Sequence, residues 1–267
     1  MYTGHRLIFK SLNQGIFRLI LLGNRSFIMK QPHILCDESD VAGRVLLPGD
    51  PARVLRVAEY LDDWSEVAFN REFRTVSGNY KGVLVTVTST GIGGASAVIA
   101  VEELIACGAK SFIRIGSAGA CQTGIALGDL IISSGSVRED GASRMYAPKE
   151  YPAVPDFKLM SALVSACETA GYRYHTGITR SHDSFYIDHE AELMKKWNGL
   201  GVLASDMETS ALYTLASIRG VKAASILNNV VLYEGDVKEG VGDYVDEAGA
   251  AAKGEKREII VALEALI

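Results

Sequence analysis

From residue 44 onward, short apolar runs alternate with stretches whose apolar residues recur every three or four positions. The run at 44–49 predicts a buried strand, and the stretch at 51–61 predicts the helix that follows it. In a helix expected within 91–108, Ala97 and Val101 share one face and Glu103 lies opposite. Further strands are expected at 65–69, 110–116, 127–137 (one strand with a bend, or a pair), 175–180, 202–204 and 222–230, with a hairpin over 73–90 that turns near Ser77, Gly78 and Asn79. Further helices are expected at 156–171, 189–197 and 207–219 (with Ile218 inward), and in the apolar stripe that ends the chain.

Strands that alternate with helices are typical of an α/β domain, and no Pro-, Gly- or Ser-rich linker divides the chain. We therefore expect a single α/β domain over 29–267, built on a central mixed β-sheet flanked by helices. Residues 1–28 contain four Lys or Arg residues and no acidic residue. We interpret them as an N-terminal extension outside the fold, before a functional start at Met29, and a transit-like basic leader is the alternative.

Composition narrows the classes of function. The 267 residues carry 27 Lys and Arg against 32 Asp and Glu, a net charge of -5, whereas proteins that bind nucleic-acid phosphates show a basic excess. No apolar run reaches the ~18 residues of a membrane helix. The four cysteines have neither CxxC nor metal-ligand spacing, which indicates free thiols in a reducing compartment. We expect a cytoplasmic protein that binds small molecules, with no nucleic-acid or membrane partner.

The segment 49–53 follows the first predicted strand and opens the first helix. Asp50 suits the helix cap and Pro51 the first turn, and a helix start alone would explain this pair. Gly49 would let a ligand approach the backbone. Arg53 is a cation in the first turn, where it opposes the helix dipole, and a nearby anion would relieve the mismatch. An anion site and a plain helix start both remain open.

Arg114 lies within an apolar strand, which is unusual because a lone buried charge is costly to desolvate. The strand is expected to end at Gly116, in a loop of small residues that includes Ser117. In open α/β sheets, ligands bind at the C-terminal ends of strands. A phosphate held by Arg114, Ser117 and loop N–H groups is one interpretation. A structural ion pair with a carboxylate such as Glu103 is the other.

Two further segments carry polar residues. Ser205 and Glu208 have the S-x-x-E spacing of a capping box, although Glu208 could instead accept hydrogen bonds from a diol. Ser181, His182 and Asp183 cannot converge as a catalytic triad, because neighbours on a strand point to opposite faces. Phe185 either stacks on a planar ring or belongs to the core, and the core is the default interpretation.

Taken in order, these segments resemble the nucleoside phosphorylase family of uridine phosphorylases and hexameric-type purine nucleoside phosphorylases. The matching stretches are PGDPARV at 48–54, NREFRTV at 70–76, STGIGGAS at 89–96, VEELIACGAKSFIRIGSAGA at 101–120, VRED at 137–140, HDSFY at 182–186 and SDMETSAL at 205–212. The resemblance runs from about residue 33 to the C-terminus. It implies a mixed sheet that is partly barrel-like.

The resemblance also implies phosphorolysis, in which phosphate attacks the anomeric carbon of the ribose and the base departs. It assigns phosphate binding to Gly49, Arg53, Arg71, Arg114 and Ser117, ribose binding to His33, Met207 and Glu208, and base binding to Phe185, Asp188, His189 and Gly119. Arg53, Arg114 and Glu208 would be catalytic, and Arg71 and His33 would reach a neighbouring subunit's site. The implied assembly is a homodimer at least and commonly a homohexamer. Phosphate is a co-substrate, no cofactor is required, and potassium would lie at Glu72, Ile92 and Ser96, as in some members.

The identity of the base is ambiguous. Where uridine phosphorylases present a Gln and an Arg to uracil, Asp188 takes the place of the Gln and the Arg is missing. Asp188 could equally be the N-cap of an exposed helix. Where purine enzymes have an Asp in a late strand, residues 225–231 contain none. We expect uridine phosphorolysis, as in pyrimidine salvage, with a purine nucleoside phosphorylase as the alternative.

Two other classes use the same kind of site. A nucleosidase would use water and would not need three arginines for phosphate. A non-catalytic nucleoside-binding protein would keep Glu208 and Phe185, but it could lose Arg53 or Arg114. Both arginines are present, which favours an enzyme.

Overall fold

The computed structural model describes residues 30–235 and 249–267. Its strands are β1 (Arg44–Pro48), β2 (Asp62–Asn70), β3 (Phe73–Tyr80), β4 (Val83–Thr88), β5 (Ser111–Ala120), β6 (Leu130–Glu139), β7 (Tyr174–His182), β8 (Ala204–Asp206) and β9 (Lys222–Val231). Its helices are α1 (Pro51–Ala58), α2 (Gly94–Ala106), α3 (Gly141–Tyr146), α4 (Phe157–Ala170), α5 (Glu190–Gly199), α6 (Thr209–Arg219) and α8 (Ala250–Leu266). The predicted extension at 1–28 and the start at Met29 lie outside the described residues and stay predictions.

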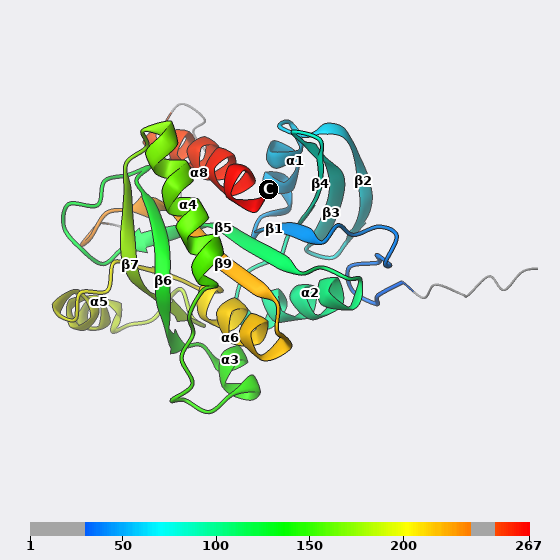
Figure 1. Cartoon of the computed structure of the whole chain (residues 1–267). Helices are drawn as coiled ribbons and strands as arrows, with labels where there is room; N and C mark the ends of the chain where they lie inside the picture. The colour runs from blue at the N-terminus through cyan, green and yellow to red at the C-terminus, as the bar shows by residue number, and fades with distance from the viewer. Residues whose placement is uncertain (1–29, 236–248) are drawn as a thin grey trace, which may run out of the picture.

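All the strands named above form one mixed sheet in the order β2-β3-β4-β1-β5-β8-β7-β6-β9. Strand β9 also pairs with β5, so that β5, β8, β7, β6 and β9 close into a barrel. Strands β2, β3 and β4 extend the sheet beyond β1 on one side of the molecule (Figure 1). The predicted single α/β domain with a mixed, partly barrel-like sheet is confirmed.

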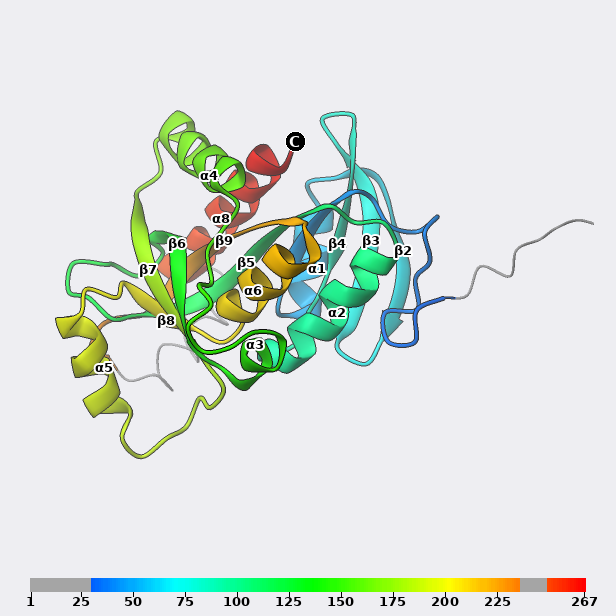
Figure 2. The same cartoon turned by 60° about the horizontal axis from the view of Figure 1, so that its bottom comes forward.

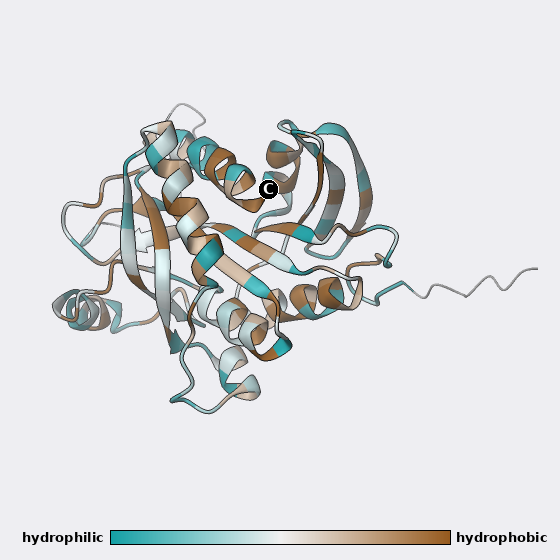
Figure 3. Cartoon of the chain, viewed as in Figure 1, coloured by the Kyte–Doolittle hydropathy of each residue, from teal (hydrophilic) through white to brown (hydrophobic). Residues whose placement is uncertain are grey.

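Helices cover the sheet in two groups (Figure 2). Helices α1, α4 and α8 supply Val54, Leu163 and Ile259 to one core, and helices α2 and α6 supply Val101 and Leu215 to a second. Apolar residues, brown in Figure 3, occur along the strands and on helices of both groups, and α2 is apolar over most of its length. Strand β5 runs between the two groups and contributes buried residues to both cores. Polar groups on β5 are therefore held rigidly in the middle of the fold.

The hairpin turns later than expected. It turns at Lys81 and Gly82, both at positive φ, and β3 continues through Ser77–Asn79. A Cβ atom on Gly78 would lie 2.6 Å from the Cβ of Trp64, so this glycine allows β2 to pack closely against β3. The glycine that suggested a turn instead serves strand packing.

For the stretch 127–137, the alternative of one strand with a bend is confirmed: it is β6, which begins at Leu130 and shifts its register with β7 between Ser133 and Gly135. Two further expectations need correction. Strand β5 does not end at Gly116 but continues to Ala120, because its small residues pair with β8 and β9. Ile218, expected to face inward, is half exposed near the end of α6.

Two compositional expectations can also be compared with the described residues. All four cysteines are buried and unpaired, as predicted. Within 30–235 and 249–267, no helix is long and apolar enough to cross a membrane.

Candidate active site

Arg114 forms the centre of the candidate site. Its guanidinium is buried in the middle of β5, where Nε donates to Asp206 Oδ2 over 3.0 Å and Nη2 donates to Glu208 Oε2. Its third nitrogen, Nη1, is also buried and has no hydrogen-bond partner among the described residues. The ion pair with a carboxylate is thus confirmed, but its partners are Asp206 and Glu208, and Glu103 as the example is wrong. An N–H group that is buried without an acceptor is suited to receive an anion.

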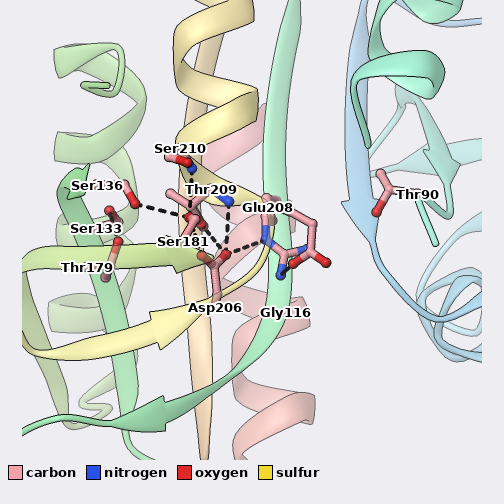
Figure 4. Close-up of polar contacts among 12 residues, drawn as sticks. Thr90, Gly116, Ser133, Ser136, Thr179, Ser181, Asp206, Glu208, Thr209 and Ser210 are labelled. Carbon is pink, nitrogen blue, oxygen red and sulfur yellow. Dashed lines mark hydrogen bonds and ion pairs between the residues drawn. The ribbon is translucent and has the colours of Figure 1, made fainter. Parts of the chain in front are cut away.

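Gly116 makes room for this guanidinium. A Cβ atom at position 116 would lie 2.5 Å from Arg114 Nη2, so a larger residue there would force the guanidinium to move away from Asp206 and Glu208. The arginine folds along its own strand over the glycine, so Arg-x-Gly on β5 is a structural unit. The close-up in Figure 4 shows Gly116 below the polar group that Asp206 and Glu208 complete.

The electrostatics keep Arg114 charged. Burial lowers the pKa of its guanidinium, but the negative charges of Glu208 and Asp206 outweigh this effect and raise that pKa. Burial raises the pKa of the Glu208 carboxyl, against the lowering effect of Arg114. The group of three charges is thus held together in a region that water does not reach, where each interaction is stronger than at the surface.

Asp206 connects the site to a network of hydroxyl groups. It accepts hydrogen bonds from Ser181 Oγ at 2.5 Å and from the backbone N–H of Thr209 at 3.0 Å (Figure 4). Ser181 Oγ in turn accepts from the backbone N–H of Ser210. This network holds the carboxylate rigidly, and with it the orientation of Arg114.

The predicted capping box is wrong. Helix α6 begins at Thr209, and its first N–H is capped by Asp206 instead of Ser205. Ser205 lies in β8, and Glu208 accepts the backbone N–H of Gly93 at 2.5 Å. Because Glu208 faces Arg114 and the start of α2 instead of its own helix, it is available to the site.

Arg53 lies beside the same stretch of β5. Its side chain is buried, and it donates to Ser117 Oγ at 3.1 Å and to the backbone carbonyl of Ile115 at 3.3 Å. Its Nε donates to Glu255 Oε2 at 2.8 Å. The anion that offsets the unfavourable position of Arg53 in the first turn of α1 is therefore the Glu255 carboxylate on α8. The contact with Ser117 still places two of the predicted phosphate residues together.

Gly49 directly follows β1 and contacts the loop that precedes α2. The backbone N–H of Gly91 donates to the Gly49 carbonyl at 3.0 Å, and that of Thr90 donates to Pro48. A Cβ atom at position 49 would lie 3.3 Å from the Gly91 carbonyl oxygen, so a larger residue would be tight. Of the predicted phosphate residues, Gly49 directly follows β1, Arg114 and Ser117 lie within the neighbouring strand β5, and Arg53 on α1 contacts Ser117.

Glu255 and Glu258 on α8 were not found by sequence reasoning. Both are buried, and Glu258 Oε1 accepts the backbone N–H of Gly116 at 2.7 Å. Burial raises the pKa of Glu258 to about 8. The signal was present: Glu255 stands one helical turn before Ile259, so this acid falls on the apolar stripe of the helix.

The predicted base-binding residues come from two segments: Phe185, Asp188 and His189 lie between β7 and α5, and Gly119 lies on β5 with Arg114. Phe185 is 39% exposed and makes an edge contact with Tyr186 at 5.0 Å, so the core interpretation is wrong. Asp188 is exposed and is not the N-cap of α5: His189 holds that position, without a side-chain cap. Gly119 lies within β5, where it pairs with β8 and β9.

The residues expected to serve a neighbouring subunit gather near the β2–β3 turn. Arg71 is exposed there at positive φ, and Asn70 Nδ2 donates to the His33 carbonyl at 2.8 Å. Glu103, expected opposite the apolar face of α2, is buried because its carboxylate accepts the backbone N–H groups of His33 and Ile34. His33 Nδ1 lies 2.6 Å from the same carboxylate.

The predicted potassium residues lie beside this group. Ser96 Oγ donates to Glu72 Oε1 at 2.8 Å, and the side chain of Ile92 is exposed. A Cβ atom on Gly91 would lie 2.8 Å from Ser96 Oγ, so only glycine allows this approach. Carboxylate, hydroxyl and backbone carbonyl oxygens are the donors that hard cations prefer, so these three positions fit the ion chemically.

Comparison with known proteins defines the class. Residues 44–261 match the model of the phosphorylase superfamily. This chain belongs to that superfamily, as the sequence motifs predicted.

Individual relatives are closely similar. The chain is 48% identical over 208 residues to a uridine phosphorylase of Thermococcus kodakarensis, which covers 73% of this chain and 75% of that protein. It is 42% identical over 197 residues to a guanosine phosphorylase of Halorubrum lacusprofundi, with 74% and 81% covered. The crystal structure of a uridine phosphorylase from Vibrio fischeri matches with a TM-score of 0.84 at 47% identity, covering 90% of this chain and 98% of that one.

Proposed function

We propose that this chain is a nucleoside phosphorylase that transfers the ribosyl group of uridine from uracil to inorganic phosphate. Membership of the phosphorylase superfamily and similarity to proteins named uridine phosphorylase support this reaction. The observation that carries the proposal is Arg114: two of its nitrogens pair with buried carboxylates and the buried Nη1 remains available for an anion.

Phosphate would be held by Arg114 Nη1, by Arg53 and Ser117, and by the backbone near Gly49. The bond from the anomeric carbon to the base nitrogen breaks and a bond to a phosphate oxygen forms, which yields ribose 1-phosphate and the free base. The transition state is a ribosyl cation beside a phosphate dianion. Catalysis therefore rests on aligned charges more than on proton transfer.

Ribose would be bound by Glu208 and Met207. The Glu208 carboxylate is fixed between Gly93 N–H and Arg114, yet each of its oxygens has a further lone pair for a 2′ or 3′ hydroxyl. Its negative charge would also favour the developing ribosyl cation. One carboxylate thereby orients the arginine, grips the sugar and stabilises the transition state.

Base recognition would fall to Phe185, Asp188, His189 and Gly119. The partly exposed ring of Phe185 offers a face for stacking, and Asp188 and His189 offer an acceptor and a donor for the edge of uracil. The stretch 225–231 has no Asp to protonate a purine, which favours a pyrimidine. The similarity to a guanosine phosphorylase makes purine phosphorolysis the second candidate.

The assembly proposed with this activity is a homodimer at least, and a homohexamer in the fuller form. Arg71 and His33 would each complete the site of a neighbouring subunit. Potassium would bind Glu72, Ile92 and Ser96, where it would join the subunits by charge and take no part in the reaction itself. The enzyme would act in the cytoplasm, in pyrimidine salvage.

Base release from uridine, thymidine, cytidine, inosine, guanosine and adenosine, each with and without phosphate, tests the proposal. We expect phosphate-dependent cleavage of uridine with formation of ribose 1-phosphate. Cleavage of guanosine or inosine alone would replace uridine by a purine. Cleavage without phosphate would indicate a nucleosidase, and binding without cleavage would indicate a nucleoside-binding protein.

A further inference from the structure

Arg180 on β7 is a buried arginine that the proposed reaction does not use. It is 1% exposed, and its Nε donates to Glu139 Oε2 on β6 at 2.5 Å. Its Nη1 donates to Glu190 Oε1 at 3.2 Å. Glu190 is the first residue of α5, so one guanidinium joins a barrel strand to the start of that helix.

The far end of α5 is anchored in a different way. Asn198 Nδ2 donates to the Cys121 carbonyl at 2.8 Å, and Gln122 Nε2 donates to the Asn198 carbonyl at 2.9 Å. Trp197 packs there in a buried cluster with Cys121 and Val202. With Leu193 and Met194, which pack against the same cluster, these contacts fix α5 from its second turn to its C-terminal end without Arg180. At the first residue, Glu190 makes the ionic contact, to Arg180.

Residues 184–189, which we call the 184–189 loop, lie between two anchors. On one side Asp183 Oδ2 accepts the backbone N–H of Gly141 at 2.7 Å, and on the other side Arg180 holds Glu190. Among the described residues, the hydrogen bonds of the loop itself reach only within 182–193. Its position over the barrel is therefore set by its two ends.

The contact between Arg180 and Glu190 is sensitive to loss of the positive charge of the arginine. Glu139 and Glu190 both contact one guanidinium, so without it two carboxylates of like charge would face each other. Their side chains are 26% and 27% exposed, so they can turn towards water instead of becoming neutral. Such a turn would carry Glu190, and the loop before it, away from β6.

The geometry assigns Arg180 the role of a positioning residue, which fixes the 184–189 loop by joining the first residue of α5 to β7. This role rests on the proposed function, in which the loop presents Phe185, Asp188 and His189 to the base. Arg180 acts through its contact with Glu190. Its loss should weaken nucleoside binding and leave phosphate binding unchanged.

Two readouts on the full chain test the role, with Arg180→Met and Glu190→Gln as variants and Glu139→Gln as the matched control. Glu139→Gln removes a partner of the same arginine on the side away from α5. We expect faster amide hydrogen exchange over 183–192 and unchanged exchange over 197–202 in the first two variants. We expect the KM for uridine to rise about tenfold and the KM for phosphate to stay within about twofold. Glu139→Gln should change both readouts less.

Unchanged exchange over 183–192, or an equal rise in both KM values, would overturn the assignment. Should Arg180→Met fail to fold, the double variant Arg180→Met with Glu190→Gln removes one of the unpaired carboxylates and repeats the test. The exchange measurement needs no activity. It therefore still decides the role of Arg180 if the wild-type protein cleaves no nucleoside and the proposed function itself fails.

Discussion

Buried charges define this molecule at the scale of residues. Arg114 is held by Asp206 and Glu208, and Arg53 by Glu255, in places that water does not reach. Burying such groups is costly unless each charge is matched, and removing one partner leaves the other unpaired. In this group of charges, the buried N–H donor Arg114 Nη1 has no hydrogen-bond partner among the described residues. That donor is the strongest local indication of an anion ligand.

Replacement of Arg114 by lysine should abolish phosphate-dependent turnover while the protein stays folded. Lysine keeps the positive charge, but its single nitrogen cannot serve Asp206, Glu208 and an anion in the geometry of the guanidinium fork. We expect kcat/KM to fall about a hundredfold or more. Arg219→Lys is the control, because Arg219 forms a similar fork with Glu102 at the surface. Retained turnover in Arg114→Lys would remove Arg114 from the site.

Glu258 predicts a pH dependence of stability. Burial raises the pKa of the Glu258 carboxyl from its ordinary value of 4.5 to about 8 in the folded protein. Between these values the folded state binds a proton that the unfolded state releases, so stability falls as pH rises through this window. Glu258→Gln cannot titrate, and its stability should lack this decrease. Urea unfolding from pH 5 to pH 9 should show the variant gaining on the wild type, by on the order of a few kcal/mol at pH 8. Parallel profiles would contradict the prediction.

At the scale of elements, the ends of strands and helices position the site. Strand β5 carries Arg114 and Ser117, the start of α1 brings Arg53, and the start of α2 brings the N–H of Gly93 to Glu208. Helix α8 adds two buried acids: Glu255 accepts a hydrogen bond from Arg53, and Glu258 accepts one from the backbone N–H of Gly116. Elements that are far apart along the chain thus contribute one or two groups each.

Glu208 directly precedes α6, and a substitution can test whether its role is structural or in the site. Glu208→Gln should raise the KM for uridine, because the carboxylate that grips the ribose and orients Arg114 is lost. Its effect on Tm does not discriminate, since Arg114 also loses an ionic partner. Asp156→Ala is the control: it removes a true N-cap bond from α4, to Leu159 N–H, and should cost about 1 kcal/mol of stability without changing that KM. An unchanged KM in Glu208→Gln would favour a structural role.

At the scale of the whole molecule, the barrel and the extension by β2 to β4 present two distinct groups of residues. The Arg114 group is buried at the centre, and the group with His33, Arg71 and Glu72 lies at the edge of the extension. If the edge of one subunit completes the centre of another, the unit of activity is a dimer.

Complementation between subunits tests this arrangement. Arg71→Ala and Arg114→Ala chains should each be inactive alone. When the two are co-expressed, mixed dimers should regain one site that has Arg114 from one chain and Arg71 from the other. Random pairing would restore about a quarter of wild-type activity. Mixtures as inactive as the separate variants would show that Arg71 does not act across an interface.

Several elements and some site residues were predictable from the sequence for identifiable reasons. Apolar periodicity located α2, α4 and β9 closely, because each buries a regular face. Arg114 stood out because a cation within an apolar strand must have a partner. The partner itself was misassigned to Glu103, since proximity along the chain says nothing about contacts that the barrel creates between β5 and β8.

Phe185, Ser205 and Glu208 show the limit of local patterns. The S-x-x-E spacing is a valid capping signal, but Asp206 caps α6 because β8 ends two residues later than the expected strand at 202–204. Phe185 is apolar and therefore resembles a core residue, yet the loop that carries it lies outside both cores.

By itself, the sequence determined the alternation of strands and helices, the free cysteines and the family, because these depend on periodicity, composition and ordered motifs. Only the tertiary structure decided which carboxylates meet Arg114 and Arg53, that Glu255 and Glu258 close the site from α8, and that Arg180 anchors α5. Those contacts join residues separated by 10 to more than 200 positions. The pairing of β5 with β8 and the packing of α5 and α8 on the barrel bring them together, and no local pattern encodes that distance in space.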